Sequence, residues 1–249
     1  MSKLGFVDFA GGTVIHTTAG FGCLAAVFFL GRRNQKNIAM KPNNLMAAAV
    51  GTGLLWFGWF GFNAGGAYQA GNLAAVAFAN TFIALASGMV TWTIYARLVR
   101  GKFDFVDVMT GSVAGLATIT PIAGYIEPYK AVLVGIVAGI ICNIALSFQE
   151  KKGWDDALGV WGVHGIGGFT GTILIGLLAD KEINGVSASL QQLKIQVGGV
   201  IFVALYAFIL TAIILKLLSH VMRIKPSDEQ IQQGLDETLL NEQTYDLNP

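Results

Sequence analysis

Seven apolar stretches, each long enough to cross a lipid bilayer as a helix, dominate this sequence of 249 residues. A transmembrane helix needs about 20 mostly apolar residues, and backbone groups in hydrocarbon must be hydrogen-bonded within the helix. Hydrophobic residues make up 54% of the sequence and charged residues only 12%, too little polar surface for a soluble domain of this length. We therefore predict an all-α, polytopic membrane helix bundle with about seven transmembrane helices, over residues 9–31, 44–65, 72–97, 106–125, 130–148, 157–179 and 195–218.

The segments between the apolar stretches are short and rich in glycine, proline, asparagine or charge. They predict a single membrane domain over residues 1–224. Residues 225–249 hold six acidic residues among Gln, Asn and Leu, a composition typical of a solvated and partly disordered tail. The first eight residues lack the basic segment and apolar core of a signal peptide, so we expect the chain to begin at its first helix.

The lysines and arginines predict the orientation of the bundle, because cytoplasmic loops of membrane proteins carry the excess of positive charge. Twelve fall on one side: Arg32, Arg33, Lys36, Lys41, Arg97, Arg100, Lys102, Lys151, Lys152, Lys216, Arg223 and Lys225. Four fall on the other: Lys3, Lys130, Lys181 and Lys194. We therefore predict a multi-pass protein of the cell membrane with a cytoplasmic C-terminal tail, in which the first helix runs inward and the sixth outward.

Two of the predicted helices begin with the same pattern, an aspartate followed eight residues later by a histidine. The copies are Asp8 to His16 in the first apolar stretch and Asp156 to His164 in the sixth. An aspartate at a helix N-terminus accepts from free N–H groups, and eight residues at 1.5 Å each place the histidine about 12 Å into the helix, close to the bilayer midplane. Because the two helices run in opposite directions, we predict a partial inverted repeat whose histidines meet there.

An ionisable residue inside a bilayer is costly and usually faces a cavity or a partner, so His16 and His164 are the strongest functional candidates. A neutral imidazole carries one donor and one acceptor, so two of them can share a hydrogen bond and still contact a small solute. The alternative is that each histidine bonds only a neighbouring backbone group. For Asp8 and Asp156, a structural role at the helix start is favoured over ion binding.

An aromatic cluster in residues 56–66, at the outer end of the second predicted helix, has two interpretations. Aromatic side chains at that depth usually form an interfacial belt. Aromatic faces also attract cations, by about 0.5–1 kcal/mol when exposed and by about 2 or more when desolvated, which would suit a small cation at a pore entrance. The residues by themselves leave both interpretations open.

Several classes of function have no support in the sequence. The net charge is +1 and there is no basic stripe, which argues against nucleic-acid binding. Cys23 and Cys142 lie in apolar stretches without paired spacing, so we predict buried thiols and not a disulfide or a metal site. No cofactor is predicted, and nothing points to covalent chemistry, so we do not expect an enzyme.

Four motifs together resemble the ammonium transporter family, which includes methylammonium permeases and Rhesus glycoproteins. They are Asp8-Phe-Ala-Gly-Gly-Thr-Val-Ile-His16, Gly58-Trp-Phe-Gly-Phe-Asn-Ala-Gly65, Thr120-Pro-Ile-Ala-Gly-Tyr125 and Gly162-Val-His-Gly165, and they are spread over almost the whole chain. The resemblance implies a homotrimer in membrane lipid, with a pore for ammonium, ammonia or methylammonium through each subunit. It also assigns residues: His16, His164, Thr120 and the gate residue Phe62 to the pore, Trp59 and Gly66 to the outer vestibule, and Asp8 to the family's essential aspartate.

The resemblance covers the fifth to eleventh of the family's eleven helices, so we expect a shortened form of such a transporter. Gly66 stands where many bacterial members have a pore-mouth serine, and any hydroxyl contact there would be lost. In the tail, Gly234-Leu-Asp236 follows the family's regulatory pattern, which implies a PII-type signal protein as a partner. Leu240 and Asn241 replace a His-Gly pair of that pattern.

The function that these features favour is conduction of ammonium, which loses a proton before it passes the two histidines. A bare cation in hydrocarbon costs many kcal/mol, whereas neutral ammonia costs little. One alternative is a b-type cytochrome membrane subunit in which His16 and His164 are axial haem ligands on antiparallel helices. A further alternative is an inactive membrane fragment that only binds partners.

Overall fold

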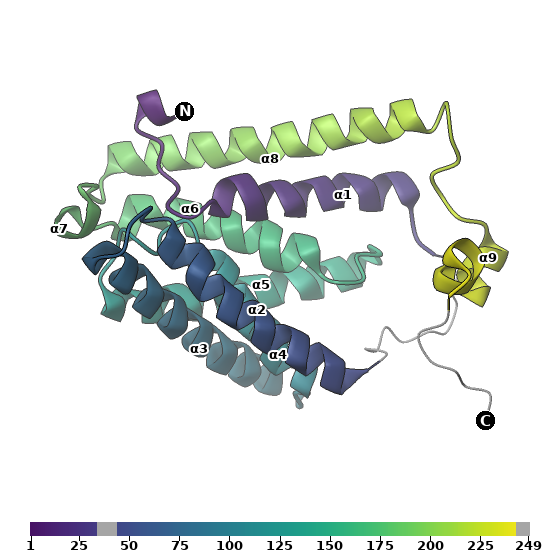
Figure 1. The fold of residues 1–249 in the computed structure, drawn as a ribbon, viewed down its shortest axis with the longest axis horizontal. Helices are drawn as coiled ribbons and strands as arrows, with labels where there is room; N and C mark the ends of the chain where they lie inside the picture. The colour runs from purple at the N-terminus through teal and green to yellow at the C-terminus, as the bar shows by residue number, and fades with distance from the viewer. Residues whose placement is uncertain (34–43, 243–249) are drawn as a thin grey trace.

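The computed structural model describes residues 1–33 and 44–242, and within these ranges its regular elements are all helical (Figure 1). The main helices are α1 (Thr18–Leu30), α2 (Leu45–Gly65), α3 (Asn72–Arg100), α4 (Phe105–Ile119), α5 (Pro128–Lys152), α6 (Ile166–Leu178) and α8 (Leu190–Leu218). Shorter elements are the 3-10 turn Ser2–Leu4, the π-helical turns Gly12–Thr17, Trp161–Gly165 and Asp236–Leu240, and the helices α7 (Lys181–Asn184) and α9 (Asp228–Gln233). The predicted all-α class is confirmed.

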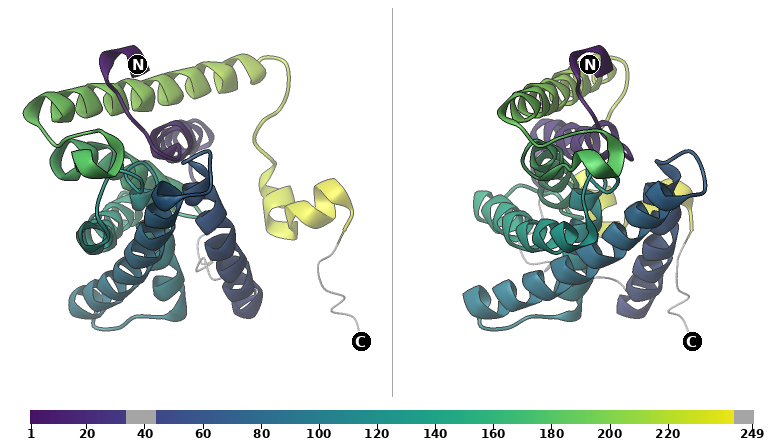
Figure 2. Two further views of the ribbon diagram at one scale, coloured as in Figure 1. Left: turned by 60° about the vertical axis from the view of Figure 1, so that its left-hand side comes forward. Right: turned by 90° about the vertical axis from the view of Figure 1, so that its left-hand side faces the viewer.

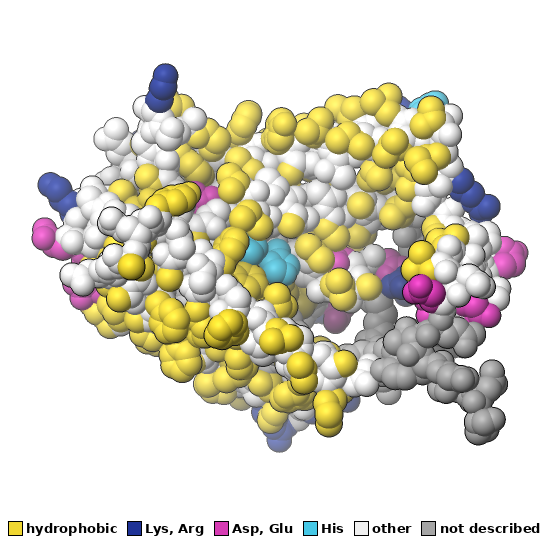
Figure 3. Space-filling view, in the orientation of Figure 1, with side chains coloured by type: hydrophobic (Ala, Val, Ile, Leu, Met, Phe, Trp, Pro, Cys, Tyr) yellow, Lys and Arg dark blue, Asp and Glu magenta, His cyan; other side chains and the backbone are white. Residues whose placement is uncertain are grey.

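Six helices in the described ranges are long and apolar enough to cross a membrane. They are Gly12–Leu30, Leu45–Gly65, Asn72–Arg100, Pro128–Lys152, Trp161–Leu178 and Leu190–Leu218, and each overlaps a predicted stretch. Large apolar side chains are exposed along them, and hydrophobic side chains are spread over the whole face drawn in Figure 3. Such a surface suits lipid and not water. Lys36 and Lys41, which contributed to the predicted orientation, lie outside the described residues.

The fourth predicted stretch, 106–125, is the exception, because α4 ends at Ile119 after 15 residues. Pro121 cannot donate a backbone hydrogen bond, and a proline shortly after the C-cap is a common way for a helix to stop. The chain then turns, and the carbonyls of Thr120 and Pro121 accept from the N–H groups of Ala10 and Phe9. The early end of α4 therefore places Thr120 beside the N-terminal segment.

The two histidine-bearing helices lie at the centre of the arrangement. Figure 1 shows α1 and α6 running in opposite directions, since α1 leads toward the end that carries α9 whereas α6 leads into α7 at the other end. Both pack against α8, which lies along one side of the molecule in both views of Figure 2. Helices α3, α4 and α5 pack against one another on the other side, with α2 against α3 and α4. The predicted antiparallel relation of the first and sixth apolar stretches is present.

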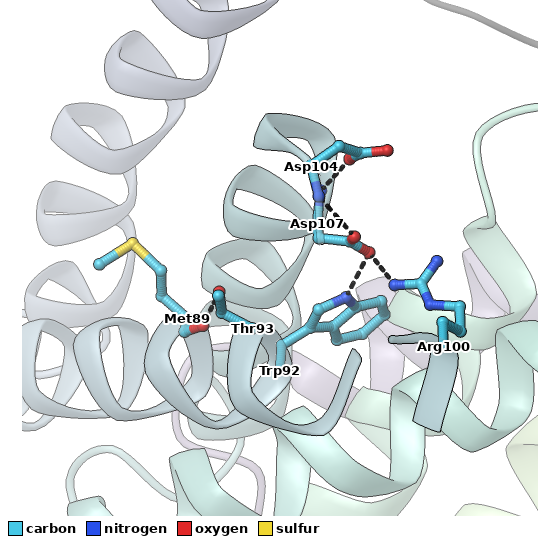
Figure 4. A network of polar contacts seen from close by, with 6 residues as sticks. All are labelled: Met89, Trp92, Thr93, Arg100, Asp104 and Asp107. Atoms are coloured by element: carbon cyan, nitrogen blue, oxygen red, sulfur yellow. Dashed lines mark hydrogen bonds and ion pairs between the residues drawn. The ribbon is translucent and has the colours of Figure 1, made fainter. Parts of the chain in front are cut away.

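A polar network closes the connection between α3 and α4 (Figure 4). Asp104 and Asp107 form a reciprocal capping box at the start of α4, which pairs backbone N–H groups that the helix cannot satisfy itself. The Asp107 carboxylate also accepts from Trp92 Nε1 at 3.1 Å and forms an ion pair with Arg100. The network joins the end of α3 to the start of α4, and so sets the packing of the layer that supports Thr120.

Gln196 on α8 joins the segment that precedes the first π-helical turn to the bundle. Its side chain is fully buried, its Oε1 accepts from the N–H of Val7 at 3.1 Å, and its Nε2 donates to the carbonyls of Val7 at 2.7 Å and Thr172 at 3.3 Å. An irregular backbone segment at membrane depth needs partners of this kind, because lipid offers none. The side chain thus fixes the start of the chain against α6 and α8.

We expect Gln196→Leu to lower the thermal unfolding midpoint of the purified protein in detergent. The substitution leaves the N–H and carbonyl of Val7 without partners, at about 1–3 kcal/mol for each buried unsatisfied group. The matched control is Gln191→Leu, an exposed position on the same helix, which should leave the midpoint nearly unchanged. Equal effects of the two substitutions would contradict this role for Gln196.

Candidate functional site

Both histidines lie in π-helical turns at the start of their helices. His16 is in the turn Gly12–Thr17, which continues into α1, and His164 is in the turn Trp161–Gly165, which continues into α6. π-helical turns are rare in proteins, and those that occur are frequently found at functional sites. The structure corrects the predicted spacing: the helices begin several residues after the aspartates, so a regular rise from aspartate to histidine does not apply.

The two aspartates accept backbone hydrogen bonds in equivalent ways. Asp8 Oδ2 accepts from the N–H of Thr13 at 2.9 Å and of Val14 at 3.3 Å, and Asp156 Oδ2 accepts from the N–H of Trp161 at 2.9 Å. In both copies the partner lies five residues after the aspartate, in the first turn of the helix. Both carboxylates thus bond backbone groups at the start of the histidine-bearing helices, and a structural role for Asp8 and Asp156 stays a prediction.

The imidazole rings of His16 and His164 meet directly. The Nδ1 atoms are 3.3 Å apart and the ring centroids 5.2 Å apart. His16 is 5% exposed, whereas His164 is half-buried. The two side chains are 148 positions apart in the sequence. Their hydrogen bond joins the Nδ1 atom of one ring to the Nδ1 atom of the other, so one ring donates and the other accepts.

Glycines at the helix crossing let the two rings approach. A Cβ on Gly20 would lie 2.1 Å from Gly165 Cα and 2.4 Å from Gly165 N, so no larger residue fits between these backbones. A Cβ on Gly168 would lie 2.7 Å from His16 Cβ. Small residues allow this close packing of membrane helices. Gly20 and Gly165 are next to the histidines in sequence, one turn after His16 and directly after His164.

Thr120 and Trp59 complete the polar contacts around His16. Thr120 Oγ1 is 3.3 Å from His16 Nε2, accepts from Trp59 Nε1 at 2.9 Å and donates to the carbonyl of Leu116 at 2.7 Å. The indole of Trp59 stacks on both imidazoles, with centroid distances of 5.1 Å to His16 and 6.3 Å to His164. Trp59 therefore lies against the histidine pair itself, closer to the centre of the site than the outer position predicted for it.

An apolar groove of about 500 Å³ opens onto the site from one side. Its lining consists of Ile15, His16, Gly51, Leu54, Leu55, Gly58, Trp59 and Phe62. Phe62 is 40% exposed, and its ring centroid is 6.3 Å from that of His16. Histidine atoms are visible among apolar side chains near the middle of the face in Figure 3. His16 is thus the ionisable side chain of a groove that is otherwise lined by glycine, aliphatic and aromatic residues.

Gly66 lies at the C-terminal end of α2, apart from the groove. A Cβ there would be 2.8 Å from the carbonyl oxygen of Phe9 and 3.0 Å from its ring. The close approach of Phe9 explains the glycine in steric terms. Among the described residues there is no group of three His, Cys, Asp or Glu side chains suited to a metal ion, and both cysteines are free thiols.

An ion pair joins the C-terminal end of the first histidine-bearing segment to the start of the second. Arg33 follows α1, and its side chain and N–H donate to the carboxylate of Asp155, directly before Asp156. The hydrogen bond from Arg33 holds the pKa of Asp155 below its usual value, although burial opposes the shift. Because the pKa is lowered on folding, the ion pair stabilises the protein at pH values above the usual pKa and is lost as the pH falls through the lowered one.

Sequence reasoning missed several residues of the site. It did not predict the π-helical turns, the Gly20–Gly165 crossing, or the buried contact of 2.7 Å between the hydroxyls of Thr13 and Thr172, which joins the first π-helical turn to α6. The only available signal for the crossing was the glycine close to each histidine, which fits helix packing in general equally well. The contacts of Thr120 had no signal, because they depend on residues far apart in the sequence.

The fold and site define a class: a polytopic membrane bundle in which two antiparallel helices bring two imidazoles into contact beside an apolar groove. The sequence matches the Ammonium Transporter Family over residues 1–245, and the chain belongs to this family. It is 40% identical to a putative ammonium transporter of Methanothermobacter thermautotrophicus over 255 residues, which is 99% of this chain and 62% of that protein. It is 41% identical to an ammonium transporter of Aquifex aeolicus, over 98% of this chain and 58% of that protein.

Solved structures agree with the family assignment. A structure described as a sensor Amt protein has a TM-score of 0.87 and 34% identity, over 94% of this chain and 60% of that one. Mep2 of Candida albicans has a TM-score of 0.85 and 35% identity, over 92% of this chain and 54% of that one. The resemblance seen in the motifs is confirmed, and the family is one of transporters and not of enzymes. The chain spans about 60% of the length of these curated relatives.

We expect Gly20→Ala to destabilise the protein and to separate the histidine rings. Overpacking a close contact typically costs about 1–3 kcal/mol, and here the obstacle is backbone that cannot rotate away. Thermal unfolding in detergent measures the loss. The control is Gly53→Ala, at an exposed helix position where a Cβ meets nothing within 4 Å. A midpoint in Gly20→Ala as high as in the control would contradict the close crossing.

Proposed function

We propose that this chain forms the histidine-bearing part of an ammonium-conducting pore. The observation that carries the proposal is the direct Nδ1 contact of His16 and His164, beside an apolar groove that His16 lines. Membership of the ammonium transporter family supports the same substrate class. The substrates are ammonium, ammonia and methylammonium.

The apolar lining implies that the species that passes the histidines is neutral. Transfer of a bare cation into hydrocarbon costs many kcal/mol, whereas neutral ammonia loses only its hydrogen bonds to water. His16 is the ionisable side chain that lines this groove, and the other lining residues are glycine, aliphatic or aromatic. Ammonium therefore gives up its proton before it reaches His16 and His164, and ammonia continues past them.

The aromatic residues have separate roles in this proposal. Phe62 is partly exposed beside the groove and acts as a gate whose ring must move for passage. Trp59 covers both imidazoles and holds them in line. Gly66 offers no side-chain hydroxyl, so a cation at the entrance is held by aromatic faces more than by hydrogen bonds.

The haem alternative fits this geometry poorly. A haem iron would have to lie between the two histidines, but their Nδ1 atoms are in direct contact and His16 Nε2 faces Thr120. The inactive-fragment alternative is tested by function: expression of residues 1–249 in a strain without ammonium transporters, at low ammonium and acid pH. Growth would contradict that alternative, and its absence would support it.

We further propose the assembly and orientation that the family resemblance implies. The chain is a homotrimer of the cell membrane, residues 1–224 form its membrane domain, and residues 225–249 form a cytoplasmic tail that contacts a PII-type signal protein. Three of the basic side chains that support this orientation, Lys216, Arg223 and Lys225, lie at or beyond the end of α8, next to the tail.

Replacement of His16 or His164 by alanine should reduce or redirect conduction, measured in a version of the chain completed with the first four helices of the family. Each imidazole is one half of the pair, and a hydrogen bond to a neutral solute is worth about 0.5–1.5 kcal/mol, or up to roughly tenfold in rate. Uptake of labelled methylammonium measures the change. His220→Ala, at the exposed end of α8, is the control and should transport normally. Unchanged uptake and selectivity in both single variants would contradict the proposal.

The partner proposal predicts that a PII-type protein binds the chain through the tail. A pull-down with the immobilised full chain should retain the cognate PII protein, and deletion of residues 225–249 should abolish retention. Lys102→Ala, in the α3–α4 connection on the same predicted face, is the control and should bind normally. Binding that survives the deletion would place the contact elsewhere.

A further inference from the structure

The hydroxyl of Thr120 has three polar neighbours and only one proton. Trp59 Nε1 can only donate, so Thr120 Oγ1 accepts from it. The carbonyl of Leu116 can only accept, and at 2.7 Å it is at the ideal distance for the hydroxyl proton, whereas His16 Nε2 is at 3.3 Å. The hydroxyl proton therefore points at Leu116, and Thr120 has one remaining lone pair for His16.

This arrangement decides which nitrogen of His16 carries the proton. A lone pair on Thr120 requires an N–H on the other side, so His16 is protonated on Nε2. Its Nδ1 then holds a lone pair. His164 Nδ1, which is 3.3 Å from that lone pair, must in turn be the donor, and the acceptor of neutral His164 is its Nε2. One threonine thus sets both tautomers.

We propose that Thr120 is a positioning residue that fixes the hydrogen-bond direction of the histidine pair, running from His164 through His16 to Thr120. The hydrogen-bond direction follows from the distances alone, whereas its relevance to transport rests on the proposed function. Trp59 reinforces it, because the indole occupies the other lone pair of Thr120 and stacks on His16.

The consequence is an asymmetric site. At the Thr120 end, His16 presents an N–H that is already used. At the other end, His164 Nε2 presents a lone pair, and this atom has no hydrogen-bond partner within residues 1–33 and 44–242. That lone pair suits a solute with N–H groups, such as ammonia. The pair therefore accepts from its substrate at His164 and does not donate to it there.

Nitrogen-15 NMR of the histidine-labelled chain in lipid bilayers tests the proposal, because the two neutral tautomers have different ring nitrogen shifts. His220→Gln removes the third histidine of the sequence. In this background, at a pH where both rings are neutral, we expect His16 to carry its proton on Nε2 and His164 on Nδ1. The opposite assignment for His16 would overturn the proposal.

Variants separate a positioning role from a merely structural one. Thr120→Val keeps the shape of the side chain without the hydroxyl and should give a mixture of both tautomers, whereas Thr120→Ser should retain the wild-type pattern. His164→Asn should leave His16 protonated on Nε2, since Thr120 still accepts. Unchanged tautomers in a folded Thr120→Val protein would overturn the proposal, and if that variant does not fold, the His164→Asn spectrum decides. A transport assay that fails would affect the proposed function only.

Discussion

The close crossing of the two histidine-bearing helices is the contact on which the rest of the site depends. Gly20 and Gly165 touch through their backbones, so the helices approach more closely than any side chain would permit. This approach sets the distance between His16 and His164 and leaves Trp59 room to stack on both rings. Attraction between helices in lipid comes mainly from such packing and from interhelical hydrogen bonds, since burial from water contributes nothing there.

The second constraint is that polar groups in the bilayer must find partners inside the protein. The aspartates accept from backbone N–H groups at the start of each histidine-bearing turn. Gln196 bonds the backbone of the irregular segment that precedes the first of these turns. The hydroxyl of Thr120 is a hydrogen-bond partner of both His16 and Trp59. The polar groups of the site are therefore a connected set, in which each hydrogen bond also restricts the direction of the next.

The sequence allowed much of this to be predicted, because a membrane helix leaves a strong local signal. The apolar stretches predicted the helices to within a few residues, and the repeated aspartate-to-histidine spacing identified the two side chains that meet. The spacing did not predict the widened turns, because a π-helical turn at His16 or His164 has no separate hydrophobic period. The end of α4 at Ile119 was overlooked for a similar reason: the apolar run continues beyond Pro121 although the helix does not.

Composition, apolar length and the charge distribution between helices by themselves determined that this chain is a membrane bundle with an antiparallel pair of histidine segments. They did so because the free energy of transfer from water to hydrocarbon is a property of each residue and each segment separately. The tertiary structure alone decided which atoms of His16 and His164 meet, that Thr120 lies beside His16, and that an apolar groove is lined by His16. The contacts of His16 with His164 and Thr120 join residues more than 100 positions apart, and the groove joins residues 15–16 to residues 51–62, so no local pattern encodes them.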